Sequence, residues 1–244
     1  FSRENRCKGD TADWGRDIAK HPAVKDADVI ILNWINQGAL SLDCVEKLCD
    51  TGKPIIWNMH DMWECTGICH HAYECSRYKH ECGKCQYLSS NNENDLSHRV
   101  WKKKKSIFSA PNLHFVSVSN WLAKKCKESS LLGDKHITVI PNTTNVEQYS
   151  CSRLPNSNYG ISADKKVIAI GAARLDDPVK GFPILLSSLK WLKAQKPETA
   201  SKIHLILFGG LRDISLLQEI DIPYTFLGRI DANRVKDVLA HADI

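Results

Sequence analysis

The feature that most constrains this chain is a regular alternation of short apolar runs with helical patterns. Seven runs rich in β-branched and apolar residues have the length and composition of buried parallel strands. They are Asp28–Trp34, Pro54–Asn58, Leu113–Val118, Ile137–Ile140, Val167–Ala173, Ile203–Phe208 and Tyr224–Leu227. Amphipathic helical patterns lie between several of them, one behind a predicted Ser41 cap and another behind Asp231. This order predicts the α/β class.

A polar segment divides the chain near residue 150. Residues 149–164 (YSCSRLPNSNYGISAD) have no apolar period and are rich in Ser, Asn and Pro, which is typical of a linker. We therefore predict one Rossmann-like domain over residues 1–148 and a second over residues 165–244, joined by a linker over residues 149–164. The chain does not begin with Met, and it stops where Asp243 and Ile244 begin what could be a further strand. We accordingly expect both domains to be incomplete.

Composition and hydropathy exclude several classes of protein. Hydrophobic residues make up 43% of the chain and charged residues 25%, which excludes a disordered polyelectrolyte. The longest apolar stretches, such as Val29–Leu32, are far shorter than the roughly 18 residues needed to cross a bilayer. The polar first residues show no signal peptide, so we expect a cytoplasmic protein.

The positive charge is concentrated in one region of the sequence. Residues 91–130 hold eight basic and three acidic groups, a difference equal to the net charge of +5. The run Lys102, Lys103, Lys104 and Lys105 lies within an amphipathic helical pattern and predicts a helix with a basic face. Such a face is either simply solvated or a peripheral contact with anionic lipid on the inner side of the membrane. Nucleic acid is not expected, because stacking aromatics and base-reading motifs are lacking.

Cations and glycines follow two strands of the second half. Strand Val167–Ala173, which has Gly171 near its end, is followed by Arg174 and Lys180 ahead of a helical pattern, while Gly209 and Gly210 follow the next strand. A guanidinium, an ammonium and free helix N–H groups make a favourable diphosphate site. Glycines let a backbone approach a ligand closely. Spacing alone also fits ordinary loop cations.

Four cysteines are clustered in a loop of the first half. Cys69, Cys75, Cys82 and Cys85 fall within seventeen residues, and the last two form a C-x-x-C pair. Four thiolates this close predict a structural zinc site. Two disulfides are the alternative, disfavoured in a reducing cytosol. A neighbouring ligand could substitute, the candidates being Cys65, His70, His71 and His80. The remaining cysteines are expected to be small buried side chains, namely Cys7, Cys44, Cys49, Cys126 and Cys151.

Taken together, the motifs GAARLDDPVKG, LILFGG, FLGRI and IIWNMHDMWECTGICHHAYECSRYKHECGKC resemble the GT-B glycosyltransferases of family 4. More narrowly, they are similar to a bacterial surface-polysaccharide type with a Cys-rich insertion, here residues 63–90. The resemblance covers nearly the whole chain. It implies an acceptor-side N-terminal domain, a donor-side C-terminal domain, and transfer of a hexose from a nucleotide-sugar with retention of configuration, without a catalytic metal. The acceptor would be a saccharide or a lipid-linked saccharide.

The resemblance also assigns roles to residues. Arg174 and Lys180 match the pair that holds the donor diphosphate, and His60 matches a histidine that faces the transferred sugar. His60, next to Asp61, could position a sugar or acceptor hydroxyl by hydrogen bonding, although a surface His-Asp pair is the simpler interpretation. The family's Glu-x7-Glu pair is not present. We therefore expect the 244-residue chain alone to be inactive.

Two other functions fit parts of the sequence. A zinc-stapled binding module without catalysis would explain the cysteines and the basic helix, but not the cations after a strand of the second half. Another two-domain enzyme, such as a GT-B epimerase or a nucleotide-binding oxidoreductase, would share the fold. A dehydrogenase is disfavoured because no strand is followed by G-x-G-x-x-G.

Overall fold

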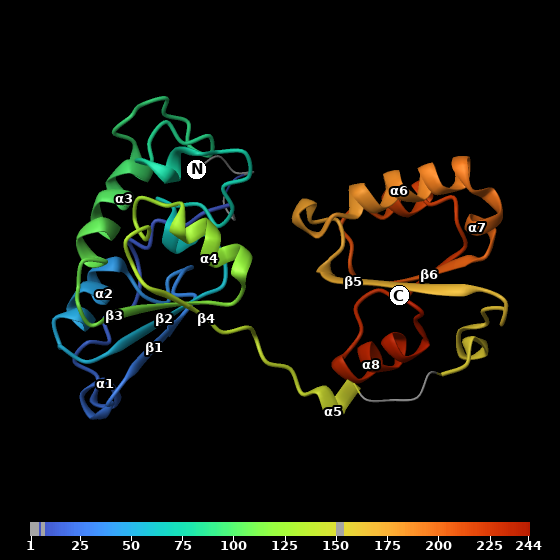
Figure 1. Ribbon diagram of the computed structural model, residues 1–244, viewed down its shortest axis with the longest axis horizontal. Coiled ribbons are helices and arrows are strands. Elements are labelled where there is room, and N and C mark those ends of the chain that lie inside the picture. Colours follow the sequence, from blue (N-terminus) through green and yellow to red (C-terminus); the bar gives the residue numbers. More distant parts are fainter. Residues whose placement is uncertain (1–4, 6–7, 150–153) are drawn as a thin grey trace. The chain divides into compact units, whose positions relative to one another are not determined.

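The computed structural model describes residue 5 and residues 8–149 and 154–244 (Figure 1). The chain forms two compact units, Phe1–Thr143 and Thr144–Ile244. All seven predicted strands are present, and both sheets are parallel. The α/β class is therefore confirmed, with a Rossmann-like alternation of strands and helices in each unit.

The first unit contains a four-stranded sheet in the order β1-β2-β3-β4. Its strands are β1 (Ile30–Asn33), β2 (Ile55–Met59), β3 (Leu113–Ser117) and β4 (Ile137–Val139). Its helices are α1 (Pro22–Asp26), α2 (Leu42–Cys49), α3 (Leu96–Ile107) and α4 (Asn120–Lys127), with short 3₁₀ turns η2 (Trp63–Cys65) and η3 (Arg77–Lys79). The predicted Ser41 cap is confirmed, because its hydroxyl accepts the Cys44 amide at 3.1 Å.

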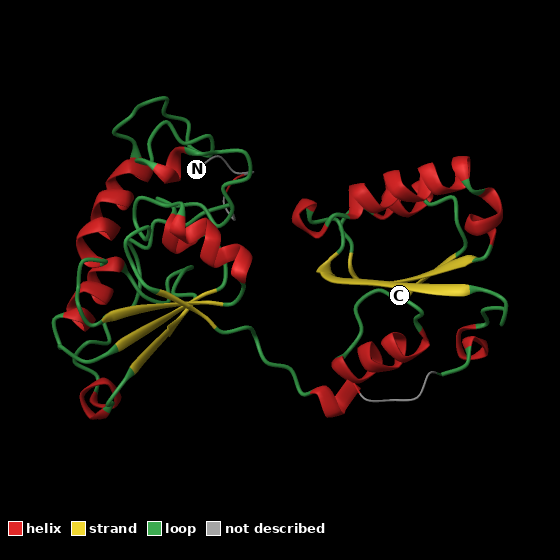
Figure 2. Ribbon diagram, viewed as in Figure 1, coloured by secondary structure: helices red, strands yellow, loops and turns green. Residues whose placement is uncertain are grey.

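Within the described residues of the first unit, helices cover one face of the sheet. Alternate residues of β1, β2 and β3 are buried against α2, α3 and α4 in a single core, in which Trp57 packs on Phe108 and Phe115. On the opposite face within this unit, the side chain of Ile31 of β1 is 63% exposed. In Figure 2, α2, α3 and α4 lie together on one side of this sheet, while the short α1 lies apart from them.

The second unit contains a three-stranded sheet in the order β5-β6-β7. Its strands are β5 (Lys166–Arg174), β6 (Ile203–Gly210) and β7 (Tyr224–Phe226). Its helices are α5 (Val146–Tyr149), α6 (Phe182–Gln195), α7 (Pro197–Ser201) and α8 (Ala232–His241), with 3₁₀ turns η4 (Asn156–Tyr159), η5 (Pro178–Lys180) and η6 (Ile214–Glu219). Helices α6 and α7 cover one face and α8 the other (Figure 1), and each face has its own apolar core.

The last two residues run beside β5. The Asp243 amide donates to the Val167 carbonyl and the Ala169 amide to the Ile244 carbonyl, both at 2.8 Å. The neighbouring Lys166 amide donates to the carbonyl of Lys202, just before β6, so the backbone groups of Val167 face the other edge of β5. Strands β6 and β7 are added on one side of β5, and the chain then returns to the other side of β5, so the strand order reverses there.

Part of the predicted linker packs on the second unit. Ile161 is buried with Val167, Ile206 and Val238 in the core beneath α8. The amide of Asn156 donates to the Ser162 and Lys165 carbonyls at 3.3 and 3.1 Å. Residues 150–153 of that segment lie outside the described residues.

One member of the lysine run, Lys104, does not lie on the predicted basic face of α3, and the contact of that face with anionic lipid stays a prediction. Lys104 is fully buried, and Lys103 pairs with Asp43 at 2.6 Å. Lys102 and Lys105 are exposed, and the Lys105 ammonium lies 4.8 Å from the Trp101 ring centroid. Successive helical residues are turned by about 100°, so four consecutive lysines cannot share one face. No helix among the described residues is long and apolar enough to cross a lipid bilayer.

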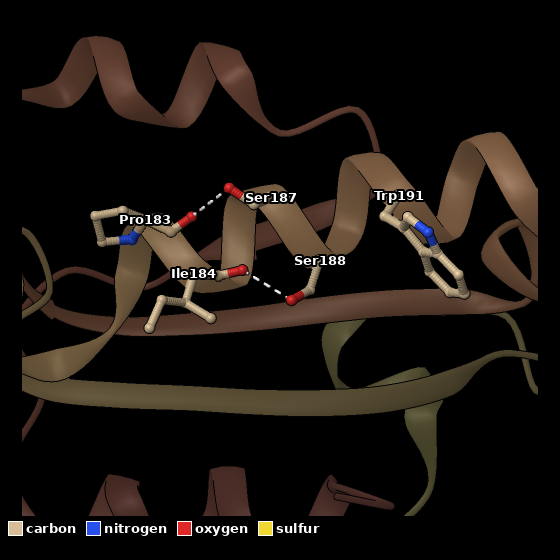
Figure 3. A pocket seen from close by; sticks show the side chains of 5 residues that line it. All are labelled: Pro183, Ile184, Ser187, Ser188 and Trp191. Carbon is tan, nitrogen blue, oxygen red and sulfur yellow. Dashed lines mark hydrogen bonds between the residues drawn. The ribbon is translucent and has the colours of Figure 1, made fainter.

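The outer surface of α6 carries two exposed apolar side chains. Ile184 is 73% and Trp191 63% exposed. Between them, the Ser187 and Ser188 hydroxyls donate to the Pro183 and Ile184 carbonyls of their own helix at 3.0 and 2.8 Å (Figure 3). These hydroxyls are satisfied within the helix, which leaves a shallow, largely apolar surface over α6.

Candidate functional site

The carboxyl ends of β1 and β2 bring three polar side chains together. The Asn58 amide nitrogen donates to Asn33 Oδ1 at 3.0 Å, because Asn33 and Asn58 are in register across the two strands. His60 Nε2 lies 3.2 Å from Asn33 Oδ1 and 3.3 Å from the Asn58 nitrogen. His60 is therefore not an isolated surface residue, but one member of a cluster of amides and an imidazole.

Asp61 organises the adjacent loop. Its Oδ2 lies 2.9 Å from His70 Nδ1 and accepts the Trp34 indole N–H at 3.2 Å, and its Oδ1 accepts the Trp63 amide at 2.7 Å. Burial alone would raise the pKa of Asp61, but its bonds to His70, Trp63 and Trp34 bring that pKa below its ordinary value. An ionised carboxylate with these partners fixes the loop. Sequence analysis identified Asp61 but not Asn33, Trp34, Asn58 or a role for His70 beyond that of a substitute metal ligand.

In the second unit, Arg174 ends β5 and is flanked by two carboxylates. Its Nε lies 3.3 Å from Asp176 and its Nη2 3.6 Å from Asp177. The Asp177 carbonyl in turn accepts the Lys180 amide at 2.8 Å. Lys180 ends η5, immediately before Gly181 leads into α6 with a φ of 76°. The structure thus places both predicted cations in one short loop at the carboxyl edge of the sheet.

Two positions at this edge require glycine because of their surroundings. A Cβ at Gly171 would lie 2.0 Å from the Phe208 ring, so Gly171 makes room for that ring. Gly209 has a φ of 120°, and a Cβ there would lie 1.7 Å from the Ala172 carbonyl oxygen. Both positions therefore need glycine for packing or backbone conformation. Their contact with a donor stays a prediction.

Arg229 is a third cation at this edge, and sequence analysis did not single it out. It follows β7, and its guanidinium lies against Gly210, where an added Cβ would be 3.1 Å from Nε and 3.3 Å from Nη2. Gly210 is itself in register with Arg174. Cations after the ends of neighbouring parallel strands converge on one edge. The same rule that identified Arg174 would have identified Arg229.

The four clustered cysteines of the insertion lie close together. Each of Cys69, Cys75, Cys82 and Cys85 interacts electrostatically with the other three. Burial, and then the neighbouring thiols, raise the pKa of Cys69 to about 12. Yet among the residues that the structure describes, no group of three or more His, Cys, Asp or Glu side chains is placed to hold a metal ion. The predicted zinc site is not confirmed.

The other thiols have simpler positions. All eight described cysteines are free, so the disulfide alternative gains no support. Cys44 and Cys126 are buried, as predicted, and Cys49 is partly buried. Cys7 and Cys151 lie outside the described residues.

Lys104 fastens the insertion to the first unit. Its ammonium donates to the Trp63 carbonyl at 2.5 Å and the Thr66 carbonyl at 3.1 Å, and lies 3.2 Å from the centroid of the Trp63 ring. Burial lowers the pKa of Lys104 to about 7, against the opposing charge of Glu64. The buried base of the insertion is thus held by a lysine of α3.

Comparison with solved structures finds a similar fold. The chain resembles Anabaena HepE, whose crystal structure contains UDP and glucose, with a TM-score of 0.51 and 16% sequence identity. The match covers 93% of this chain and 54% of HepE, so the chain spans about half the length of that protein. No family model matches the sequence. No curated protein sequence matches it either.

Proposed function

We propose that the chain is part of a nucleotide-sugar-dependent glycosyltransferase. The observation that carries this proposal is the convergence of Arg174, Lys180 and Arg229 at the carboxyl edge of a Rossmann-like sheet. In open α/β sheets, ligands bind outside the carboxyl ends of the strands, where the strand order reverses. Strand β5 lies at such a reversal. The likeness of fold to a protein solved with UDP and glucose supports a nucleotide-sugar.

The cations suit the chemistry of sugar transfer. Breaking the bond between a sugar and a nucleoside diphosphate builds negative charge on the leaving phosphate. Fixed cations stabilise that charge before it develops, without the need to reorganise solvent. Asp176 and Asp177 orient Arg174 in the free protein, while Lys180 has no ion-pair partner among the described residues. We assign Arg174, Lys180 and Arg229 to the diphosphate, and Gly209 and Gly210 to close backbone approach.

In the first unit we assign His60 and Asp61 to the sugar and acceptor side. His60 can exchange hydrogen bonds with hydroxyl groups because an imidazole has both a donor and an acceptor nitrogen. Asp61, engaged by three donors, positions the loop rather than reacting itself. Retention of configuration, a hexose as the transferred sugar, and a saccharide or lipid-linked acceptor in bacterial surface-polysaccharide synthesis are parts of the proposal that rest on the family 4 resemblance.

A structural zinc ion is a further part of the proposal. Its support is the mutual interaction of the four thiols, which are the ligand type that zinc prefers. Binding would have to bring at least three sulfurs to one point. Metal analysis of protein purified without added zinc tests this: one zinc per chain is expected, and metal-free protein with four reactive thiols would contradict it.

Calorimetry with UDP tests the donor site. We expect the unaltered chain to bind UDP, and Arg174→Ala and Lys180→Ala each to lose about 2 kcal/mol of binding free energy, because each removes a charged partner of a phosphate. Lys202→Ala is the matched control, since Lys202 precedes β6 at the opposite edge of the sheet. Equal affinity in all four proteins, or no binding by the unaltered chain, would reject the proposal.

A further inference from the structure

Trp34 is held in a strained backbone conformation at the end of β1. Its φ is +39°, in the left-handed region that bulky residues avoid. Such a conformation persists only where the surrounding structure imposes it, and it is concentrated at functional sites. The residue is nonetheless 39% exposed, so its strain does not serve to bury the indole.

The indole is fixed by groups behind it. Its N–H donates to Asp61, and its ring stacks on His70 with centroids 5.9 Å apart and planes at 29°. His70 is bound to the same carboxylate at 2.9 Å. An aromatic ring that is partly exposed and held on one side by a hydrogen bond and a stacked imidazole is a preformed surface for a ligand.

Hydrogen-bonding groups lie at the end of the same strand. Asn33 precedes Trp34 in the chain, and it bonds to Asn58 and His60. Asn58 Oδ1 is buried without a hydrogen-bond partner among the described residues. An unsatisfied acceptor in a native structure calls for an explanation, and a ligand hydroxyl would supply the missing donor once the Asn58 amide turns toward it.

We infer that this edge of the first unit binds a pyranose ring, stacked on Trp34 with its hydroxyls bound to Asn58, Asn33 and His60. A pyranose presents an apolar C–H face and a rim of hydroxyls, which the indole and the amides match. The groups around this strand end are amides and an imidazole rather than a set of cations, so the ligand is a neutral sugar and not a nucleotide. The inference rests on the proposed function in taking this sugar to be the acceptor.

Saturation-transfer NMR with methyl glucoside, methyl galactoside and methyl mannoside tests the inference on the full chain. We expect saturation of the ring C–H protons of at least one glycoside. Trp34→Ala should abolish the effect, and Trp34→Phe should leave a weaker one, because a smaller aromatic face remains. Trp121→Ala is the matched control, since Trp121 belongs to the same unit and is 56% exposed; it should retain the full signal.

Trp34→Gly separates binding from folding. Glycine accepts a positive φ without strain, so the melting temperature should change little while the saturation is lost. Undiminished saturation in Trp34→Gly, or none in the unaltered chain with any of the three glycosides, would overturn the inference. UDP calorimetry on the same samples distinguishes the two proposals: UDP binding without glycoside binding overturns only this one, and Trp34-dependent glycoside binding without UDP binding overturns only the donor site.

Discussion

The two units use the same alternation of strands and helices, yet one sheet is covered on one face and the other on both. In the first unit, strands β1 to β4 are added in one direction. Right-handed crossovers in one direction place every connecting helix on the same side. In the second unit, the chain after β7 returns to the far edge of β5, and α8 therefore crosses on the opposite face. The direction of strand addition, more than composition, decides which faces are buried.

The carboxyl edges of the two sheets also differ in charge. The first presents amides, an imidazole and an indole fixed by Asp61. The second presents Arg174, Lys180 and Arg229. Neutral hydrogen-bonding groups suit sugar hydroxyls, whereas cations suit phosphates. The two edges thus divide the recognition of a nucleotide-sugar reaction between them under the proposed function.

The difference in helical coverage between the two sheets predicts the largest change in stability. Ile206 of β6 is fully buried, while Ile31 of β1 is 63% exposed. Ile206→Ala should lower the free energy of unfolding by about 4 kcal/mol, because it opens a cavity in the core. Ile31→Ala should change it by less than about 0.5 kcal/mol. Hydrogen exchange of the amides of each sheet, measured across a urea titration, gives the free energy of unfolding for both variants. Similar losses of free energy in the two variants would show that the Ile31 face of the first sheet is buried in solution.

A second prediction concerns the cation that the first unit buries. Lys104→Met should destabilise that unit by about 3 kcal/mol, because the Trp63 and Thr66 carbonyls lose their donor. Lys102→Met, at an exposed position of the same helix, should have almost no effect. Exchange rates of the β1 to β4 amides report the result. If the two variants were equally stable, Lys104 would not fasten the insertion.

Sequence predicted the strands better than the sites. Apolar runs mark buried strands whichever partners they find, so all seven were identified. The lysine run was misinterpreted because helical rotation turns Lys104 toward the core, a direction that composition does not reveal. Cysteine spacing predicted proximity, which the structure bears out, but not convergence on a metal. The positive φ of Trp34 has no sequence signal, since glycine or asparagine is the usual residue in that conformation.

A third prediction sharpens the contrast between the two edges. Arg229→Ala should weaken UDP binding by about 2 kcal/mol, because a charge-assisted contact to phosphate is lost. Gly210→Ala should have a smaller effect in the same direction, since the added methyl would displace the guanidinium. Calorimetry with UDP, using Lys202→Ala as control, measures both. Unchanged affinity in Arg229→Ala would leave Arg174 and Lys180 as the diphosphate ligands.

The smallest effect concerns Glu64, a carboxyl buried in the first unit with one oxygen lacking a hydrogen-bond partner among the described residues. Burial, and then the charge of Asp61, raise its pKa from 4.5 to about 8, although Lys104 opposes the shift. The folded chain therefore holds a proton that the unfolded chain releases between these pH values, so this carboxyl destabilises the fold progressively as pH rises through that window. Glu64→Gln cannot ionise and should match the unaltered chain near the lower limit. Near pH 8, the upper end of that window, the free energy of unfolding of Glu64→Gln should exceed that of the unaltered chain by at least about 1 kcal/mol. Urea unfolding across the window gives the difference, and a gap that stays constant with pH would mean that Glu64 is already ionised in the folded protein.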